Sequence, residues 1–78
     1  MEQPHNLSQL KPGQRAFVTH ISTAGTIRRR LMDLGLTPHT EVMCLGRSPL
    51  GDPSAYLIRD AVIAIRAKDS QNIIIATE

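Results

Sequence analysis

The sequence predicts a mainly β protein, a small five-stranded barrel with one short α-helix between the first and second strands. Apolar residues repeat at helical spacing only once, at Ile27, Leu31 and Leu34, whereas five other short stretches are typical of strands. The longest connection between them without a helix, residues 46–54, contains two prolines and two glycines, which exclude regular structure there. The 78 residues form a single domain, 1–78, with one modest core. Closing so small a sheet into a barrel removes its exposed edges.

The first strand is expected over residues 14–22, directly after a tight turn at Pro12-Gly13. Proline followed by glycine is typical of the central positions of a type II turn, and the second position needs a positive φ. Gly13 is therefore assigned a structural role. We expect Ala16 and Val18 to face the core. Strict alternation would turn Ile21 away from the core, so a β-bulge is expected just before it.

One short helix is expected within the stretch from Thr26 to Pro38, with Thr23 or Thr26 as its N-cap. About two turns of helix are not stable alone in water, because nucleation is unfavourable. We therefore expect the helix to dock on one open end of the barrel through an apolar stripe. The residues of this stripe are Ile27, Leu31 and Leu34.

The C-terminal end of this helix is marked by Gly35 and Leu36. Glycine takes the left-handed conformation at the C′ position without strain, and the residue after it folds back on the helix in a Schellman motif. We expect Gly35 to adopt a positive φ and Leu36 to contact Leu31. Pro38 prevents the helix from continuing.

Four further strands follow the helix. They are expected at residues 40–45, 55–59, 62–66 and 72–76. A loop over residues 46–54 joins the second strand to the third, Asp60-Ala61 forms a tight reversal, and residues 67–71 form a single turn. In the last strand Ile74 faces outward if its neighbours face inward. This indicates either a covered sheet edge or a self-association contact through Ile74.

Three consecutive arginines lie on the predicted helix: Arg28, Arg29 and Arg30. They lie in its first turns, where the helix macrodipole disfavours cations, so local helix stability does not explain them. One interpretation is a solvated face whose aliphatic stems cover the sheet. The other is a binding surface for an acidic partner.

The loop between the second and third strands is a second candidate for partner binding. Its residues are Pro49, Leu50, Gly51, Asp52 and Pro53. Two prolines stiffen it, and Leu50 lies at its tip, where a mere connector needs no large apolar side chain. Leu50 either contacts a partner or folds back to plug the second end of the barrel.

No catalytic residues, metal site or cofactor are predicted. The three histidines are scattered, and no recognisable set of nucleophile, base or metal ligands occurs. Cys44 is the only cysteine, which excludes an internal disulfide and a CxxC motif, and it is expected to be partly buried.

Composition limits the partners and the location of the chain. With two aromatic residues and a net charge of +2, the chain lacks the stacking platform and the strong basic footprint of nucleic-acid-binding domains. The N-terminal residues lack the pattern of a signal peptide, and no apolar run is long enough to span a membrane. We therefore expect a cytoplasmic protein without membrane insertion.

Three motifs occur in a fixed order along the chain. They are Leu10-Lys11-Pro12-Gly13 before the first strand, Arg-Leu-Met-Asp-Leu-Gly-Leu-Thr-Pro at residues 30–38, and Pro-Leu-Gly-Asp-Pro at residues 49–53. Together they resemble the ferrous iron transport protein A (FeoA) family, and the resemblance extends over residues 7–75. It implies an SH3-like barrel in the cytoplasm.

The resemblance also implies a function. The chain would be a non-catalytic accessory protein of ferrous iron uptake that docks on the cytosolic, GTP-binding part of a FeoB-type membrane transporter and modulates it. The association with iron would come through this partner and not through metal ligands of the chain itself. A related domain ends some metal-dependent transcriptional repressors. The alternative is therefore a regulatory module that acts with such a repressor or with nucleic acid.

At two positions the chain departs from the family, which usually has glycine where His39 and Asp60 stand here. A left-handed residue at His39 would cost about 1 kcal/mol because histidine has a Cβ atom, unless the turn has changed type. Asp60 tolerates such a turn better than most residues.

Overall fold

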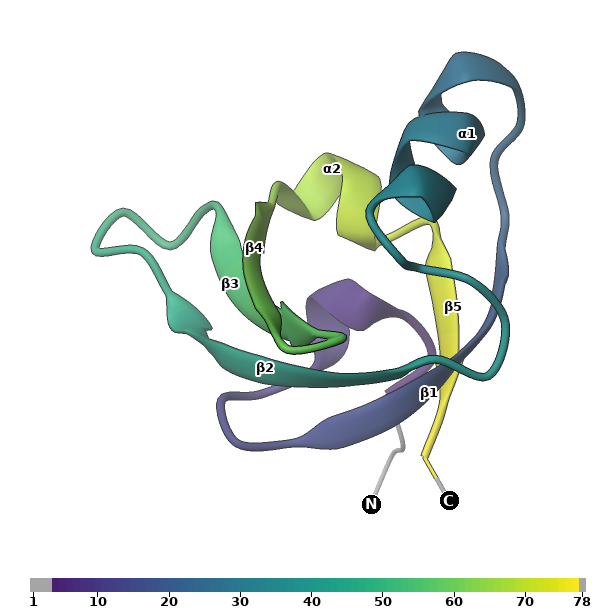
Figure 1. Cartoon of the computed structure of the whole chain (residues 1–78). Helices are drawn as coiled ribbons and strands as arrows, with labels where there is room; N and C mark the ends of the chain where they lie inside the picture. Colours follow the sequence, from purple (N-terminus) through teal and green to yellow (C-terminus); the bar gives the residue numbers. More distant parts are fainter. Residues whose placement is uncertain (1–3, 78) are drawn as a thin grey trace.

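The computed structural model describes residues 4–77 and confirms the mainly β, SH3-like fold class (Figure 1). The elements in chain order are the 3₁₀-helix η1 (Leu7–Gln9), β1 (Arg15–Ile21), α1 (Gly25–Asp33), β2 (Glu41–Arg47), β3 (Ser54–Ile58), β4 (Ala61–Ile65), α2 (Ala67–Ser70) and β5 (Ile73–Ala76). The single turn expected at residues 67–71 is the short helix α2, so α1 is not the only α-helix.

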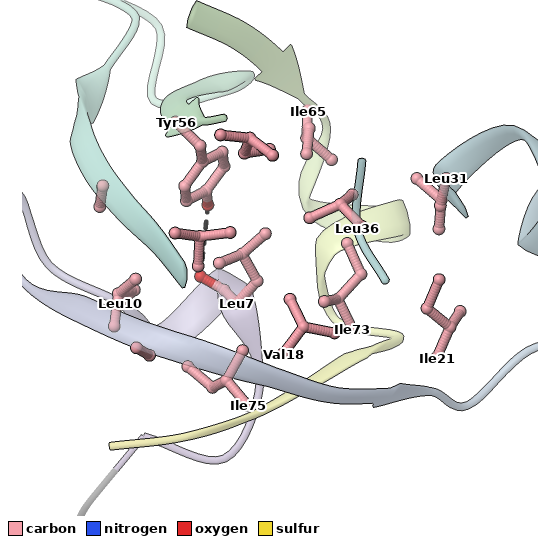
Figure 2. Close-up of a cluster of buried hydrophobic side chains, with 14 residues drawn as sticks. Leu7, Leu10, Val18, Ile21, Leu31, Leu36, Tyr56, Ile65, Ile73 and Ile75 are labelled. Carbon is pink, nitrogen blue, oxygen red and sulfur yellow. Dashed lines mark hydrogen bonds between the residues drawn. The ribbon is translucent and has the colours of Figure 1, made fainter. Parts of the chain in front are cut away.

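The five strands form one antiparallel sheet in the order β4-β3-β2-β1-β5, and this sheet curls around the core (Figure 1). The sequence predicted a closed barrel. Within the described residues, however, β4 and β5 do not pair, so hydrogen bonds do not close the sheet. Side chains fill the gap instead. Figure 2 shows buried Leu36 between Ile65 of β4 and Ile73 of β5.

Strand β1 matches its predicted pattern. Ala16, Val18 and Ile21 are buried, and the pairing register with β5 shifts between Val18 and His20, which is the expected bulge. The turn before β1 is also confirmed. Gly13 has a φ of 91°, and the Gln14 N–H donates to the Lys11 carbonyl over 2.9 Å.

Helix α1 is less buried than its apolar stripe predicted. Leu31 is 2% exposed, but Ile27 is 46% and Leu34 38% exposed, so the prediction that these two dock on the barrel is wrong. The helix stands at the rim of the barrel and contacts the core through Leu31 and, beside it, Met32 (Figure 1). Spacing shows which residues share a helix face, but it does not show how far that face reaches over the core.

The two ends of α1 differ in how well they were predicted. Its N-cap is Ala24, without a side-chain cap, and neither candidate threonine takes that place. Gly25 begins the helix with a φ of 76°, a conformation that glycine adopts without strain. At the other end the Leu36 N–H donates to the Leu31 carbonyl over 3.2 Å, and the Gly35 N–H to Met32 over 2.9 Å. With Gly35 at φ 105°, this is the predicted Schellman motif.

The N-terminal segment completes the core, which the sequence pattern did not indicate. Leu7 and Leu10 are fully buried, and the hydroxyl of buried Tyr56 donates to the Leu7 carbonyl over 3.3 Å (Figure 2). Burial raises the pKa of Tyr56 above its ordinary value. Cys44 also lies in the core, more deeply than expected.

The same segment covers the outer edge of β5. Asn6 forms a β-bridge with Ile74, and the Ile75 N–H donates to the His5 carbonyl over 3.0 Å. Ile74 itself is half-buried. Of the two interpretations of this strand, the structure supports the covered edge.

Candidate partner-binding surfaces

The loop between β2 and β3 presents Leu50 to solvent. The side chain is 93% exposed at the tip, so it does not plug the barrel. The loop is held by two backbone hydrogen bonds, from the Gly51 N–H to the Ser48 carbonyl over 2.8 Å and from the Ser48 N–H to the Pro53 carbonyl over 3.0 Å. An apolar side chain on an internally bonded loop loses little conformational entropy on binding, which suits a contact residue.

Asp52 has a structural role within this loop. Its Oδ1 atom accepts a hydrogen bond of 2.9 Å from the Ala67 N–H, the first amide of α2. The carboxylate therefore ties the loop to the neighbouring helix. Asp52 is nevertheless exposed, as are Pro49, Leu50 and Gly51.

All three consecutive arginines are exposed, but they do not form one surface. Arg28 and Arg29 line a shallow hollow on one side of α1, together with Met32 and Asp33. Arg30 lines a different hollow, which lies between α1 and the β4–α2 segment. Within residues 4–77 none of the three guanidinium groups makes a hydrogen bond or an ion pair, so all are free to meet an acidic partner.

The two predicted surfaces lie apart. Figure 1 shows the β2–β3 loop projecting from one side of the barrel and α1 standing at the opposite side. A partner that contacts both must therefore reach across the molecule, or else two parts of the partner must bind separately.

The backbone is left-handed at both positions where the resemblance implies glycine. His39 has a φ of 73° and Asp60 a φ of 68°, so the turn at His39 has not changed type. The His39 N–H donates to the Val18 carbonyl over 2.7 Å, which holds this conformation in place. Both residues line one shallow hollow with Glu41 and Arg59. Within the described part of the chain, no three histidine, cysteine or acidic side chains are grouped so as to hold a metal ion.

The strain at His39 leads to a stability prediction. We expect His39→Gly to raise the free energy of unfolding by about 1 kcal/mol, because glycine adopts the left-handed conformation without a Cβ clash. In a domain of this size the melting temperature should rise by roughly 4–8 °C, measured by thermal unfolding. His39→Ala is the matched control, since alanine removes the imidazole and retains the Cβ atom. Equal melting temperatures for the two variants would contradict the backbone explanation.

The sequence analysis missed an apolar row on the outer face of the sheet. Met43, Leu57 and Val62 lie side by side across β2, β3 and β4, and Val62 is 67% exposed. Alternation along each strand could have placed these residues on one face. Their alignment depends on the strand register, which the sequence did not reveal.

Among residues 4–77, no helix has the length and the apolar character that a membrane crossing requires.

Comparison with known proteins adds three findings. A model of the FeoA domain family matches residues 5–77. A fusion of Fe(2+) transport protein A with the Fe(2+) transporter FeoB, from Porphyromonas gingivalis, is 28% identical over 67 residues, 86% of this chain, and the chain spans 8% of that protein. The solution structure of FeoA from Chlorobium tepidum is 36% identical, covers 92% of this chain and 69% of its own, and superposes with a TM-score of 0.85.

Two more distant structures show the fold alone. Stenotrophomonas maltophilia FeoA, an SH3 domain protein, is 23% identical, covers 94% of this chain and 91% of its own, and has a TM-score of 0.82. A manganese-dependent transcriptional repressor is 18% identical, and 42% of its chain superposes on 97% of this one with a TM-score of 0.83.

Proposed function

The chain belongs to the FeoA family, and we propose that it is a non-catalytic cytoplasmic accessory protein of ferrous iron uptake. In this proposal it docks on the cytosolic part of a FeoB-type transporter and modulates the transport cycle. The iron is the cargo of the transporter, and the chain itself acts through its outer surface.

The fusion protein of Porphyromonas gingivalis is the observation that carries this proposal. In that protein an FeoA part similar to this chain is joined to the transporter FeoB in one polypeptide. Joining two parts keeps each at a high effective concentration near the other, so that even a weak contact is populated. Such a connection is useful where the two parts act on one another.

Leu50 and the exposed arginines of α1 can make the contact. Leu50 offers an apolar anchor, and the arginines Arg28, Arg29 and Arg30 offer positive charge to an acidic surface. A docked protein shifts a conformational equilibrium only when it binds one state more tightly than the other. Modulation therefore requires that these contacts differ between the states of the transporter.

The alternative, a module acting with a repressor or with nucleic acid, has less support. The likeness to the manganese-dependent repressor is one of fold at 18% identity. Helix α1 has 9 residues and α2 has 4, and helix-turn-helix recognition needs a helix that lies in the major groove beside a supporting one. A salt-dependent shift of labelled DNA would favour this alternative.

The proposal predicts a loss of binding when both surfaces are changed. Arg28→Glu, Arg29→Glu and Arg30→Glu together should weaken binding to the cytosolic part of the transporter at least about tenfold, because attraction becomes repulsion. Leu50→Ala should weaken it by about tenfold if Leu50 is an anchor. Titration calorimetry measures the affinity, and uptake of labelled ferrous iron measures the effect in cells that lack the native gene.

Lys11→Glu is the control for this experiment, because it reverses an exposed charge in the β1 turn, outside both surfaces. It should bind and support uptake as the native chain does. The proposal fails if the native chain does not bind the transporter, or if the combined arginine and Leu50 variant retains both binding and iron uptake.

A further inference from the structure

Strand β4 is a sheet edge whose backbone has no strand partner on its outer side within residues 4–77. It stands at one end of the strand order, and its sequence, Ala-Val-Ile-Ala-Ile, has no charge and no proline. Sheet edges in monomeric proteins are usually blunted by charges, prolines or covering segments, because their free backbone groups pair with other chains. The opposite edge, β5, has such a cover in His5 and Asn6. The contrast marks β4 as the edge that is available for pairing.

The turn before β4 determines which of its backbone groups are free. Residues 59–60 form a two-residue turn between Ile58 and Ala61, which are paired partners. In a hairpin of this kind the flanking residues exchange both hydrogen bonds, and alternate residues then point away from the neighbouring strand. The N–H and C=O groups of Val62 and Ala64 therefore point to the free edge. Both residues are exposed.

A groove of about 300 Å³ lies at the C-terminal end of this edge, between β4 and α1, and Val62 lies just outside it. Ala64 belongs to its strand side, and Leu34, which is 38% exposed, belongs to its helix side. The charged side chains that line the groove are Arg30, Arg66, Lys68 and Asp69. Three cations thus face one carboxylate.

We propose that this groove binds an extended acidic segment of the transporter's cytosolic part, which adds a strand to β4. The inference rests on the proposed function. Of the three arginines that the proposed function assigns to transporter binding, it places only Arg30 in this groove. Strand addition obtains affinity from main-chain hydrogen bonds, here to Val62 and Ala64, and specificity from side-chain contacts. Alternate side chains of the segment would contact Leu34 and pair their carboxylates with Arg30, Arg66 and Lys68.

The charge of the groove favours this occupant over a second copy of the chain. The edge strand that a second copy would present, Ala61–Ile65, is uncharged and would leave the three cations unpaired. An acidic segment neutralises them and excludes basic segments by repulsion.

Two matched charge reversals test the groove. Arg30→Glu with Arg66→Glu should weaken binding to the cytosolic part of the transporter at least about tenfold more than Arg28→Glu with Arg29→Glu. Both pairs change the net charge equally, so a difference between them reports position and not overall charge. All four residues are exposed, which preserves the fold of both variants.

The backbone contribution is tested separately. Amide hydrogen exchange, followed by NMR, should slow at Val62 and Ala64 when the complex forms. Ala64→Pro should weaken binding, because proline lacks the N–H that faces the groove and this N–H is not used within the sheet. Ala64→Ser keeps the N–H and should weaken binding much less than Ala64→Pro does.

The outcomes distinguish the two proposals. One outcome is that the native chain binds while both double charge-reversal variants weaken binding equally and the amides of Val62 and Ala64 stay unprotected. In that case the groove inference is wrong and the proposed function stands. If the native chain does not bind, the proposed function fails and this inference fails with it. Protection of these amides in the concentrated free protein would assign the edge to a second copy and overturn the inference.

Discussion

Leu31→Ala is expected to lower the free energy of unfolding by about 2 to 5 kcal/mol. Leu31 is the one fully buried side chain of α1, so its removal leaves a cavity under the helix and removes most of its attachment. The expected loss is a large fraction of the stability of a small domain. Denaturant unfolding measures it, and the melting temperature should fall by about 10 °C or more.

Ile27→Ala is the control, because both residues belong to the apolar stripe predicted from the sequence. Ile27 is 46% exposed, so its truncation removes little buried area, and alanine has the higher helix propensity. We expect a change below about 1 kcal/mol. Comparable losses in the two variants would show that α1 packs along its whole stripe, contrary to the structure.

The features of the fold that short-range patterns determine could be predicted from the sequence. The type II turn at Gly13, the bulge of β1 and the Schellman motif at Gly35 each depend on residues within a few positions of one another. The burial of Leu7 could not be predicted, because it depends on contact with Tyr56 far along the chain. For the same reason the sequence did not show that β5 has its edge covered.

The candidate surfaces also have some features that local sequence patterns predict and others that only the folded chain reveals. The sequence indicated Leu50 as a loop tip but left open whether its side chain folds inward, and only the arrangement of the loop shows that it is exposed. The three arginines are adjacent in sequence, yet the helix directs Arg30 to a different hollow from its neighbours. Arg30 meets Arg66 and Lys68 there only because β4 and α2 lie next to α1, and no local pattern contains that information.

Leu7→Ala is expected to be as damaging as Leu31→Ala, with a loss of about 2 to 5 kcal/mol of unfolding free energy. Leu7 is fully buried and lies directly below Tyr56 in Figure 2. Its truncation should also loosen the segment that covers β5, since η1 is only one short turn. Exchange of the Ile75 amide, which donates to the His5 carbonyl, should therefore become faster in hydrogen-exchange NMR.

Gln9→Ala separates this packing effect from the hydrogen bonds of the same segment. The Gln9 Oε1 atom accepts from the His5 N–H over 2.6 Å and from the Asn6 N–H over 3.3 Å, which completes a capping box around η1. Removing the Gln9 side chain should lower the free energy of unfolding by only about 1 kcal/mol, because these exposed amides can form hydrogen bonds with water instead. With the edge of β5 uncovered, Leu7→Ala should also self-associate in analytical ultracentrifugation, and Gln9→Ala should not. If Gln9→Ala proves as damaging as Leu7→Ala, hydrogen bonding and not the buried leucine holds the N-terminal segment over β5.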